Sequence, residues 1–335
     1  MAELPYPSPP GLSAALGLAA AQHGVLGRDQ ALRSGLSAGR VGALVRARRW
    51  RILRPGVYYV RGGPPPLAAR VKAAQLVYGP RAVVAGPTAA RLWEMQGPVP
   101  GPGFEHVHLS VPGRGRGTAT GVRLHGWDVP AGEVTLRYGI RLTTPGRTLR
   151  DTALLTDRHT AVSVLDSALQ QGLVDPGDLP GLRDANAGRA GAPRSRAWWE
   201  ECDGRAQSTF ETRLRLVCVD AGIAPEALQY PVHAADGGLA GHADLAWPSW
   251  GVVAEADGRG AHSLPDALYT DRGRQNRIGV APERLVLLRF TWSDLRHPAQ
   301  IAELVRAARD TAARDTAPRG GDQGRKGLGS PCQLT

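Results

Sequence analysis

Residues 242–257 read HADLAWPSWGVVAEAD, and this stretch decides the fold of the carboxy-terminal third of the chain. Apolar residues dominate both sides of a central Pro-Ser turn, a pattern that predicts two neighbouring strands, residues 242–247 and 252–257. Asp244 lies in the first strand and Glu255 in the second. Because the turn between them is short, we expect both carboxylates to reach the same edge of the sheet.

Two carboxylates placed together suit a magnesium site, because Mg²⁺ prefers hard oxygen ligands and keeps several of its waters. Held by Asp244 and Glu255 with a substrate phosphate, the ion would activate water for attack on phosphorus. Carboxylates in so apolar a context are costly without a cation. Strand alternation puts Asp257 on the same face as Glu255, which adds a third acid. The alternative is that these acids pair with arginines or cap turns.

The flanking sequence predicts a helix, three strands, a helix, a strand and a helix. Ser208 followed by Glu211 resembles a capping box that begins a helix ending at Ala221. The other expected elements are a strand at 228–232, a helix at 266–278, a strand at 285–290 and a helix at 298–309.

The amino-terminal segment predicts three helices and a β-hairpin, which is the element order of a winged helix. The helices are expected at 12–23, 28–34 and 38–48, and the strands at 50–53 and 57–60. In such a unit the third helix enters the major groove while arginines of the wing approach phosphates. The candidate contacts are Arg40, Arg46, Arg48, Arg49, Arg51 and Arg54. A protein-docking module with a solvated arginine face is the alternative.

The segment between these two regions predicts a mixed α/β arrangement without a catalytic cluster. Helices are expected at 67–78, 88–96, 147–155, 160–171 and 195–202, and strands at 106–111, 121–125 and 135–141. His106 and His108 alternate on one strand, which fits either half of a metal site or ordinary sheet histidines. The Arg114-Gly115-Arg116-Gly117 loop fits either a phosphate contact or a solvated hairpin tip.

Composition favours a polyanionic partner. The 335 residues suggest two or three packed units, and 41 basic against 30 acidic residues give a formal charge of +11. Nucleic acid, above all double-stranded DNA, is the expected partner, although high genomic GC content would also enrich arginine. Cys202, Cys218 and Cys332 are too scattered for a zinc site or a disulfide framework. With no apolar leader or spanning segment, a cytoplasmic protein without membrane attachment is expected.

Several motifs together carry a resemblance to known proteins: Asp244-Leu245-Ala246-Trp247, Glu255-Ala256-Asp257-Gly258, His262, Asp271-Arg272 and Leu288-Arg289-Phe290. Through them, residues 205–310 resemble the very-short-patch-repair-type endonuclease-like domains of the PD-(D/E)xK superfamily. The preceding chain resembles actinobacterial proteins that join this domain to an AbiEi-type antitoxin winged helix. That likeness lies in Val57-Tyr58, Thr143-Thr144-Pro145-Gly146-Arg147-Thr148 and Ser208-Thr209-Phe210-Glu211.

The resemblance implies a restriction-endonuclease-like fold in which Asp244 and Glu255 bind the catalytic Mg²⁺ or Mn²⁺. It implies Glu211 on the first helix as a further acid, although the capping box gives that residue a structural role as well. His262 would accept a proton or hold a phosphate, because histidine titrates near neutral pH. An exposed loop histidine is the alternative.

One position departs from the superfamily pattern. The lysine that follows the second acid by two residues is Asp257 here, and the chain's lysines, Lys72 and Lys326, lie outside this domain. Arg272 or Arg274 would stabilise charge developing at phosphorus but could not deprotonate water, since arginine stays protonated.

We therefore expect an α/β (α+β multidomain) protein with a DNA-docking winged helix and a Mg²⁺-dependent nuclease core. A toxin–antitoxin, repair or phage-defence context, with a toxin or repair protein as partner, is expected. The rivals are a non-enzymatic antitoxin-like regulator with a degenerate nuclease fold, and a docking protein that touches no nucleic acid. The expected divisions are a disordered amino terminus (1–11), a winged helix (12–63), a mixed α/β middle region (64–204), an endonuclease-like domain (205–310) and a disordered tail (311–335).

Overall fold

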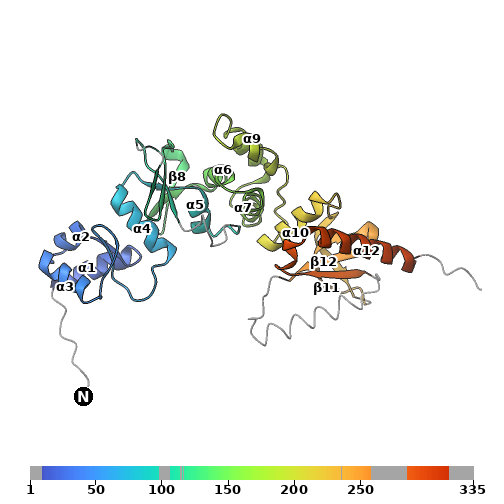
Figure 1. Cartoon of the computed structure of the whole chain (residues 1–335), viewed down its shortest axis with the longest axis horizontal. Helices are drawn as coiled ribbons and strands as arrows, with labels where there is room; N and C mark the ends of the chain where they lie inside the picture. The colour runs from blue at the N-terminus through green and yellow to red at the C-terminus, as the bar shows by residue number, and fades with distance from the viewer. Residues whose placement is uncertain are drawn as a thin grey trace, which may run out of the picture. The chain divides into compact units, whose positions relative to one another are not determined.

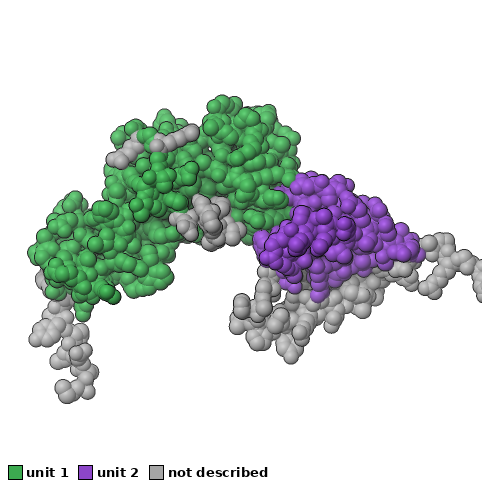
Figure 2. Space-filling model, viewed as in Figure 1, with its two compact units in different colours: residues 1–213 green, residues 214–335 purple. Residues whose placement is uncertain are grey.

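The structure, a computed structural model, describes residues 10–97, 106–113, 115, 117–234, 236–257 and 285–316. The chain is mixed α/β, as the sequence predicts (Figure 1). It divides into two compact units, residues 1–213 and 214–335 (Figure 2). None of the helices in the described ranges has the length and apolar character needed to cross a bilayer.

The amino-terminal part of the first unit contains helices around a small sheet. Its elements are α1 (Pro10–Ala21), β1 (Val25–Gly27), α2 (Arg28–Arg33), α3 (Ala38–Arg46), β2 (Arg51–Arg54) and β3 (Val57–Tyr59), with the strands in the order β1-β3-β2. The Ser37 hydroxyl begins α3 by accepting a hydrogen bond from the backbone N–H of Arg40 at 3.2 Å. Trp50 and Tyr58 pack in the core beside Leu26 and Val41. The predicted helices and hairpin are confirmed.

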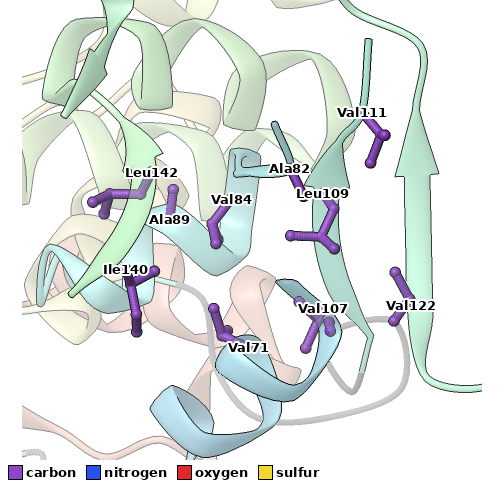
Figure 3. Close-up of a cluster of buried hydrophobic side chains, with 11 residues drawn as sticks. Val71, Ala82, Val84, Ala89, Val107, Leu109, Val111, Val122, Ile140 and Leu142 are labelled. Atoms are coloured by element: carbon purple, nitrogen blue, oxygen red, sulfur yellow. The ribbon is translucent and has the colours of Figure 1, made fainter. Parts of the chain in front are cut away.

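A six-stranded sheet follows, in the order β6-β7-β5-β4-β9-β8. The strands are β4 (Val83–Val84), β5 (Val107–Ser110), β6 (Gly117–Ala119), β7 (Val122–His125), β8 (Val134–Arg137) and β9 (Ile140–Thr143). Helices α4 (Leu67–Tyr78) and α5 (Gly86–Leu92) pack small apolar side chains against it. Figure 3 shows the resulting core, in which Val71 and Ala89 meet Val84, Leu109 and Leu142.

The single strand predicted at 135–141 is instead the hairpin β8–β9. Tyr138 and Gly139 both have positive φ, 50° and 72°, as a two-residue hairpin turn requires. The sequence pattern missed this turn because tyrosine is an unusual residue in the left-handed region.

The first unit ends in a group of helices: α6 (Pro145–Leu155), α7 (Arg158–Gln170), α8 (Leu179–Asp184) and α9 (Ala192–Ser195). The carboxylate of Asp157 begins α7 by accepting a hydrogen bond from the Thr160 N–H at 2.9 Å. The helix predicted at 195–202 is wrong, because α9 ends at Ser195 and a short 3₁₀ turn (Ala197–Trp199) follows. The indoles of Trp198 and Trp199 are both buried there, and burial outweighs their modest helix propensity.

The second unit contains a four-stranded sheet in the order β10-β11-β12-β13. Its strands are β10 (Ala227–His233), β11 (Leu239–Trp247), β12 (Val252–Ala256) and β13 (Val286–Phe290), and its helices are α10 (Thr209–Asp220), which begins in the first unit, and α12 (Pro298–Thr316). The first three strands are antiparallel, whereas β12 and β13 are parallel. Trp247 is fully buried, and its indole N–H donates to the carbonyls of Ile223 and Ala224, each at 3.0 Å.

Helix α12 contacts β12 and β13 and so covers the sheet beside them. The predicted elements of this unit are confirmed where the structure describes them, and the helix predicted at 266–278 lies outside the described residues. Disorder was predicted too broadly at both ends, since α1 begins at Pro10 and α12 runs to Thr316. Ala312 extends the buried side of α12 past the predicted end at residue 309.

Candidate functional site

A row of polar side chains crosses the four-stranded sheet, one from each strand. The antiparallel register pairs Leu245 with Ala254, and Asp244 and Glu255 are the next residues along the two strands. The parallel register sets Glu255 beside Arg289. Directly opposite residues point to the same face of a sheet. The two predicted acids are therefore neighbours across β11 and β12.

Two hydrogen bonds fix the orientation of the Asp244 carboxylate. Oδ1 accepts from the amide Nε2 of Gln229 at 3.2 Å, and Oδ2 accepts from the backbone N–H of Ala256 at 2.8 Å. The second bond reaches across to β12, one residue past Glu255. The carboxylate is thus held against the partner strand.

Glu255 lies deeper than its polarity suggests, with a side chain only 12 % exposed. Its Oε2 is 3.7 Å from Nε of Arg289, which makes an ion pair beyond hydrogen-bond length. Burial in an apolar strand raises the cost of the Glu255 charge, and a nearby cation offsets that cost.

Gln229 is the one non-glycine residue of the row with a left-handed backbone, at φ +50°. Such a conformation costs on the order of 1–3 kcal/mol and persists where the surroundings enforce it. In this sheet the left-handed residue is Gln229, the same residue whose side-chain amide donates to Asp244. The sequence did not single out Gln229 or Arg289 as site residues, although Arg289 lies in a quoted motif and strand alternation places Gln229 on the face of Asp244.

Asp257 follows the end of β12 and is exposed, and its backbone N–H donates to the Phe290 carbonyl at 2.8 Å. Within the ranges that the structure describes, no three or more His, Cys, Asp or Glu side chains gather as a metal site. The geometry therefore brings together two acids, Asp244 and Glu255. His262, Arg272 and Arg274 lie outside the described residues.

Glu211 belongs to the start of α10 in the first unit, where it is buried. Its Oε2 accepts from the backbone N–H of Gln207 at 2.8 Å, while its own N–H donates to the Ser208 hydroxyl at 3.1 Å. These bonds satisfy N–H groups at a helix beginning, which is the structural role that the capping pattern predicts.

The arginines predicted to contact DNA differ in their surroundings. The Arg54 guanidinium donates to the carbonyls of Thr120 at 2.8 Å and Gly121 at 3.5 Å, and burial lowers its pKa, whereas Arg51 donates to the Gly63 carbonyl at 2.5 Å but stays exposed. Arg54 thereby fastens the hairpin to the β6–β7 turn. The others are exposed: Arg40, Arg46, Arg48, Arg49 and Arg51.

Of the two histidines that alternate in the middle region, His108 is buried and forms a ring-to-ring hydrogen bond. Its Nδ1 lies 3.0 Å from Nε2 of His125 on the neighbouring strand. This contact accounts for His108 without a metal. Arg114 and Arg116 lie outside the described residues.

No model of a known protein family matches the chain. The chain is similar in sequence to two proteins of Mycobacterium tuberculosis: Uncharacterized protein MT2308 of strain CDC 1551 / Oshkosh and Uncharacterized protein Rv2248 of strain H37Rv. Each is 30% identical over 229 residues, which cover 67% of this chain and 79% of the relative. The chain therefore belongs to the family of these mycobacterial proteins.

Proposed function

We propose that the chain is a DNA-binding protein whose carboxy-terminal sheet is a Mg²⁺-dependent phosphodiesterase core. The observation that carries the proposal is that Asp244 and Glu255 both follow the Leu245–Ala254 pair on adjacent strands, with Asp244 hydrogen-bonded to the Ala256 N–H of β12 at 2.8 Å. In this proposal the second unit is a restriction-endonuclease-like core, and the helices and hairpin of residues 12–63 are a winged helix.

The residues fit a hydrated Mg²⁺ or Mn²⁺. Asp244 and Glu255 supply hard oxygen ligands, and one of them is largely withdrawn from water, where two neighbouring negative charges repel each other. Bound between them, the ion would supply Lewis-acid activation of water and of the substrate phosphate. Gln229 and the Ala256 N–H hold Asp244 in place for this role.

The remaining chemistry falls to groups around the row. The Arg289 guanidinium, beside Glu255, can donate to phosphate oxygens and stabilise charge that develops on them. It cannot remove a proton, because arginine stays protonated. We assign proton acceptance to His262, the histidine of the motif, and phosphate contact also to Arg272 and Arg274.

DNA docking falls to the exposed arginines around α3 and the hairpin: Arg40, Arg46, Arg48, Arg49 and Arg51. Helix α3 would enter the major groove of double-stranded DNA, and the arginines would contact phosphates. Arg54 is left out of this surface, because two backbone carbonyls already occupy its guanidinium.

The test is plasmid nicking by the purified full chain with Mg²⁺ or Mn²⁺. We expect nicking by the wild type and none by Asp244→Asn or Glu255→Gln. Asp310→Asn is the matched control, because Asp310 is an exposed acid of the same unit, on α12. Absence of nicking by the wild type, or equal nicking by the site variants, would reject the enzyme proposal.

A second candidate is a non-enzymatic antitoxin-like regulator. The observation that favours it is that both carboxylates have structural partners, Gln229 and Ala256 for Asp244 and Arg289 for Glu255. It predicts sequence-selective DNA binding that EDTA does not change. Failure to shift any DNA at low salt would instead point to a protein that docks a toxin or repair partner.

A further inference from the structure

A pocket of about 760 Å³ opens in the middle region of the first unit. Strand β7 forms one side, and the end of α6 with residues 188–191 forms the other. The described side chains that line it include three arginines and no acid; those that matter here are Arg123, His125, Trp127, Arg189 and Arg194.

Neighbouring groups hold Arg189 in a fixed position. Nη2 donates to Oδ1 of Asp151 at 2.6 Å, and Nη1 donates to Oδ1 of Asn186 at 2.8 Å. The guanidinium also lies over the Trp127 ring, 5.0 Å from its centroid. The Trp127 ring also stacks on His125, with the two ring centroids 4.0 Å apart, so this wall is packed before any ligand arrives.

Arg194 is oriented by uncharged groups. Its Nη2 donates to the carbonyls of Leu154 at 3.3 Å and Thr156 at 3.1 Å, and its guanidinium lies over Trp198 at 5.3 Å. Carbonyls and a ring direct the side chain but do not neutralise it. The positive charge of Arg194 is therefore available at the pocket wall.

Arg123 is exposed on β7, opposite Thr118 of β6. Its guanidinium makes no hydrogen bond and no ion pair with any residue of the described ranges, which sets this side chain apart from Arg189 and Arg194. In the part of the chain that the structure describes, the Arg123 side chain is therefore unrestrained at a pocket that two oriented arginines also line, and its planar donor fork can turn toward a ligand.

We infer that this pocket binds the phosphate group of a nucleotide. Guanidinium groups recognise phosphate with paired donors, and orientation before binding lowers the entropy cost. The volume lies in the usual range for small-ligand sites, and Leu124, Leu154 and Leu155 supply an apolar wall for the body of the ligand. The phosphate belongs either to a free mononucleotide or to the 5′ end of a DNA strand.

The test is calorimetric titration of the full chain in EDTA, so that the carboxylate row contributes no metal-dependent binding. The probes are adenosine 5′-monophosphate, adenosine, and a short DNA oligonucleotide with and without a 5′-phosphate. We expect binding that requires the phosphate. Preference for the mononucleotide or for the phosphorylated end then identifies the source.

Arg123→Ala and Thr118→Glu should each weaken that binding about tenfold or more, since one removes a charged donor and the other adds a repelling carboxylate. Both positions are exposed, so folding should be retained. The control is Arg141→Ala, which removes an equal charge from an exposed position on β9 of the same sheet. No difference between phosphorylated and unphosphorylated probes, or wild-type affinity in both variants, overturns the inference and leaves the nuclease proposal untouched.

Discussion

Replacing Asp151 by asparagine should destabilise the first unit more than any surface charge change. Asp151 is 0 % exposed and accepts hydrogen bonds from Nε of Arg147, at 3.0 Å to each oxygen, and from Arg189 at 2.6 Å. Asparagine keeps the shape of the side chain but removes the negative charge and turns one oxygen into an N–H₂ donor. Two guanidinium groups then lose their shared counter-ion.

The burial of the three side chains determines how much unfolding free energy the Asp151→Asn change removes. Removing one partner of a buried ion pair costs about 3–5 kcal/mol. Arg147 is only 5 % exposed but also pairs with Glu133, and Arg189 is 20 % exposed, so compensation and solvent limit the penalty. We expect the free energy of unfolding to fall by about 3 kcal/mol, at the lower end of that range.

Urea denaturation followed by circular dichroism at pH 7 measures this change. The control is Asp184→Asn, because Asp184 is exposed and pairs with Arg183 and Arg196 at the surface, where little effect is expected. The double change Arg147→Met with Asp151→Leu should recover part of the loss, since it removes the two most buried charges together and leaves the more exposed Arg189 and Glu133. Equal midpoints for Asp151→Asn and Asp184→Asn would refute the reasoning.

Three further outcomes follow from single contacts. Burial raises the pKa of the Cys218 thiol to about 12, so in the native protein at pH 8 Cys218 should resist iodoacetamide while the partly exposed Cys202 reacts, as peptide mapping would reveal. Burial acts to raise the pKa of Asp157, but hydrogen bonds from Thr160 leave it below 3.8. Its stabilisation is therefore present above the unfolded pKa and disappears as the pH falls through the folded one. Asp157→Asn should cost about 0.5 kcal/mol at pH 7 and less as the pH falls below 3.8 in thermal melts, and a constant difference would contradict this. In the proposed DNA interface, Arg49→Ala should lower the slope of log affinity against log salt by about 1 in fluorescence anisotropy, and an unchanged slope would remove Arg49 from the interface.

Local signals in the sequence were enough to predict most helices and the longer strands. Helix α4 has its predicted bounds, Leu67–Tyr78, because apolar spacing and a following glycine mark it. Ser37 marks the beginning of α3, because serine is a favoured residue at the N-terminal cap of a helix. Strands β1 and β4 were missed, since they contain three and two residues and owe their pairing to neighbours distant in the chain.

The placement of Asp244 and Glu255 on adjacent antiparallel strands was predictable because one short turn joins β11 and β12. The role of Gln229 could not be predicted from the sequence, because its left-handed backbone results from packing and not from a local preference of glutamine. The pocket could not be predicted from the sequence either, because it also depends on tertiary packing. Arg123 and Arg194 come from segments about 70 residues apart in the chain, and only the tertiary fold brings them together.

The hydrogen bonds from Arg54 to the β6–β7 turn can couple ligand binding at the pocket to the hairpin. The hairpin arginine holds the carbonyls of Thr120 and Gly121, and two residues later Arg123 lines the pocket. A ligand that shifts this turn must work against the same contact that steadies the hairpin. Linkage is reciprocal, so whatever factor such a ligand imposes on the proposed binding of DNA at the hairpin, DNA would impose on the binding of the ligand.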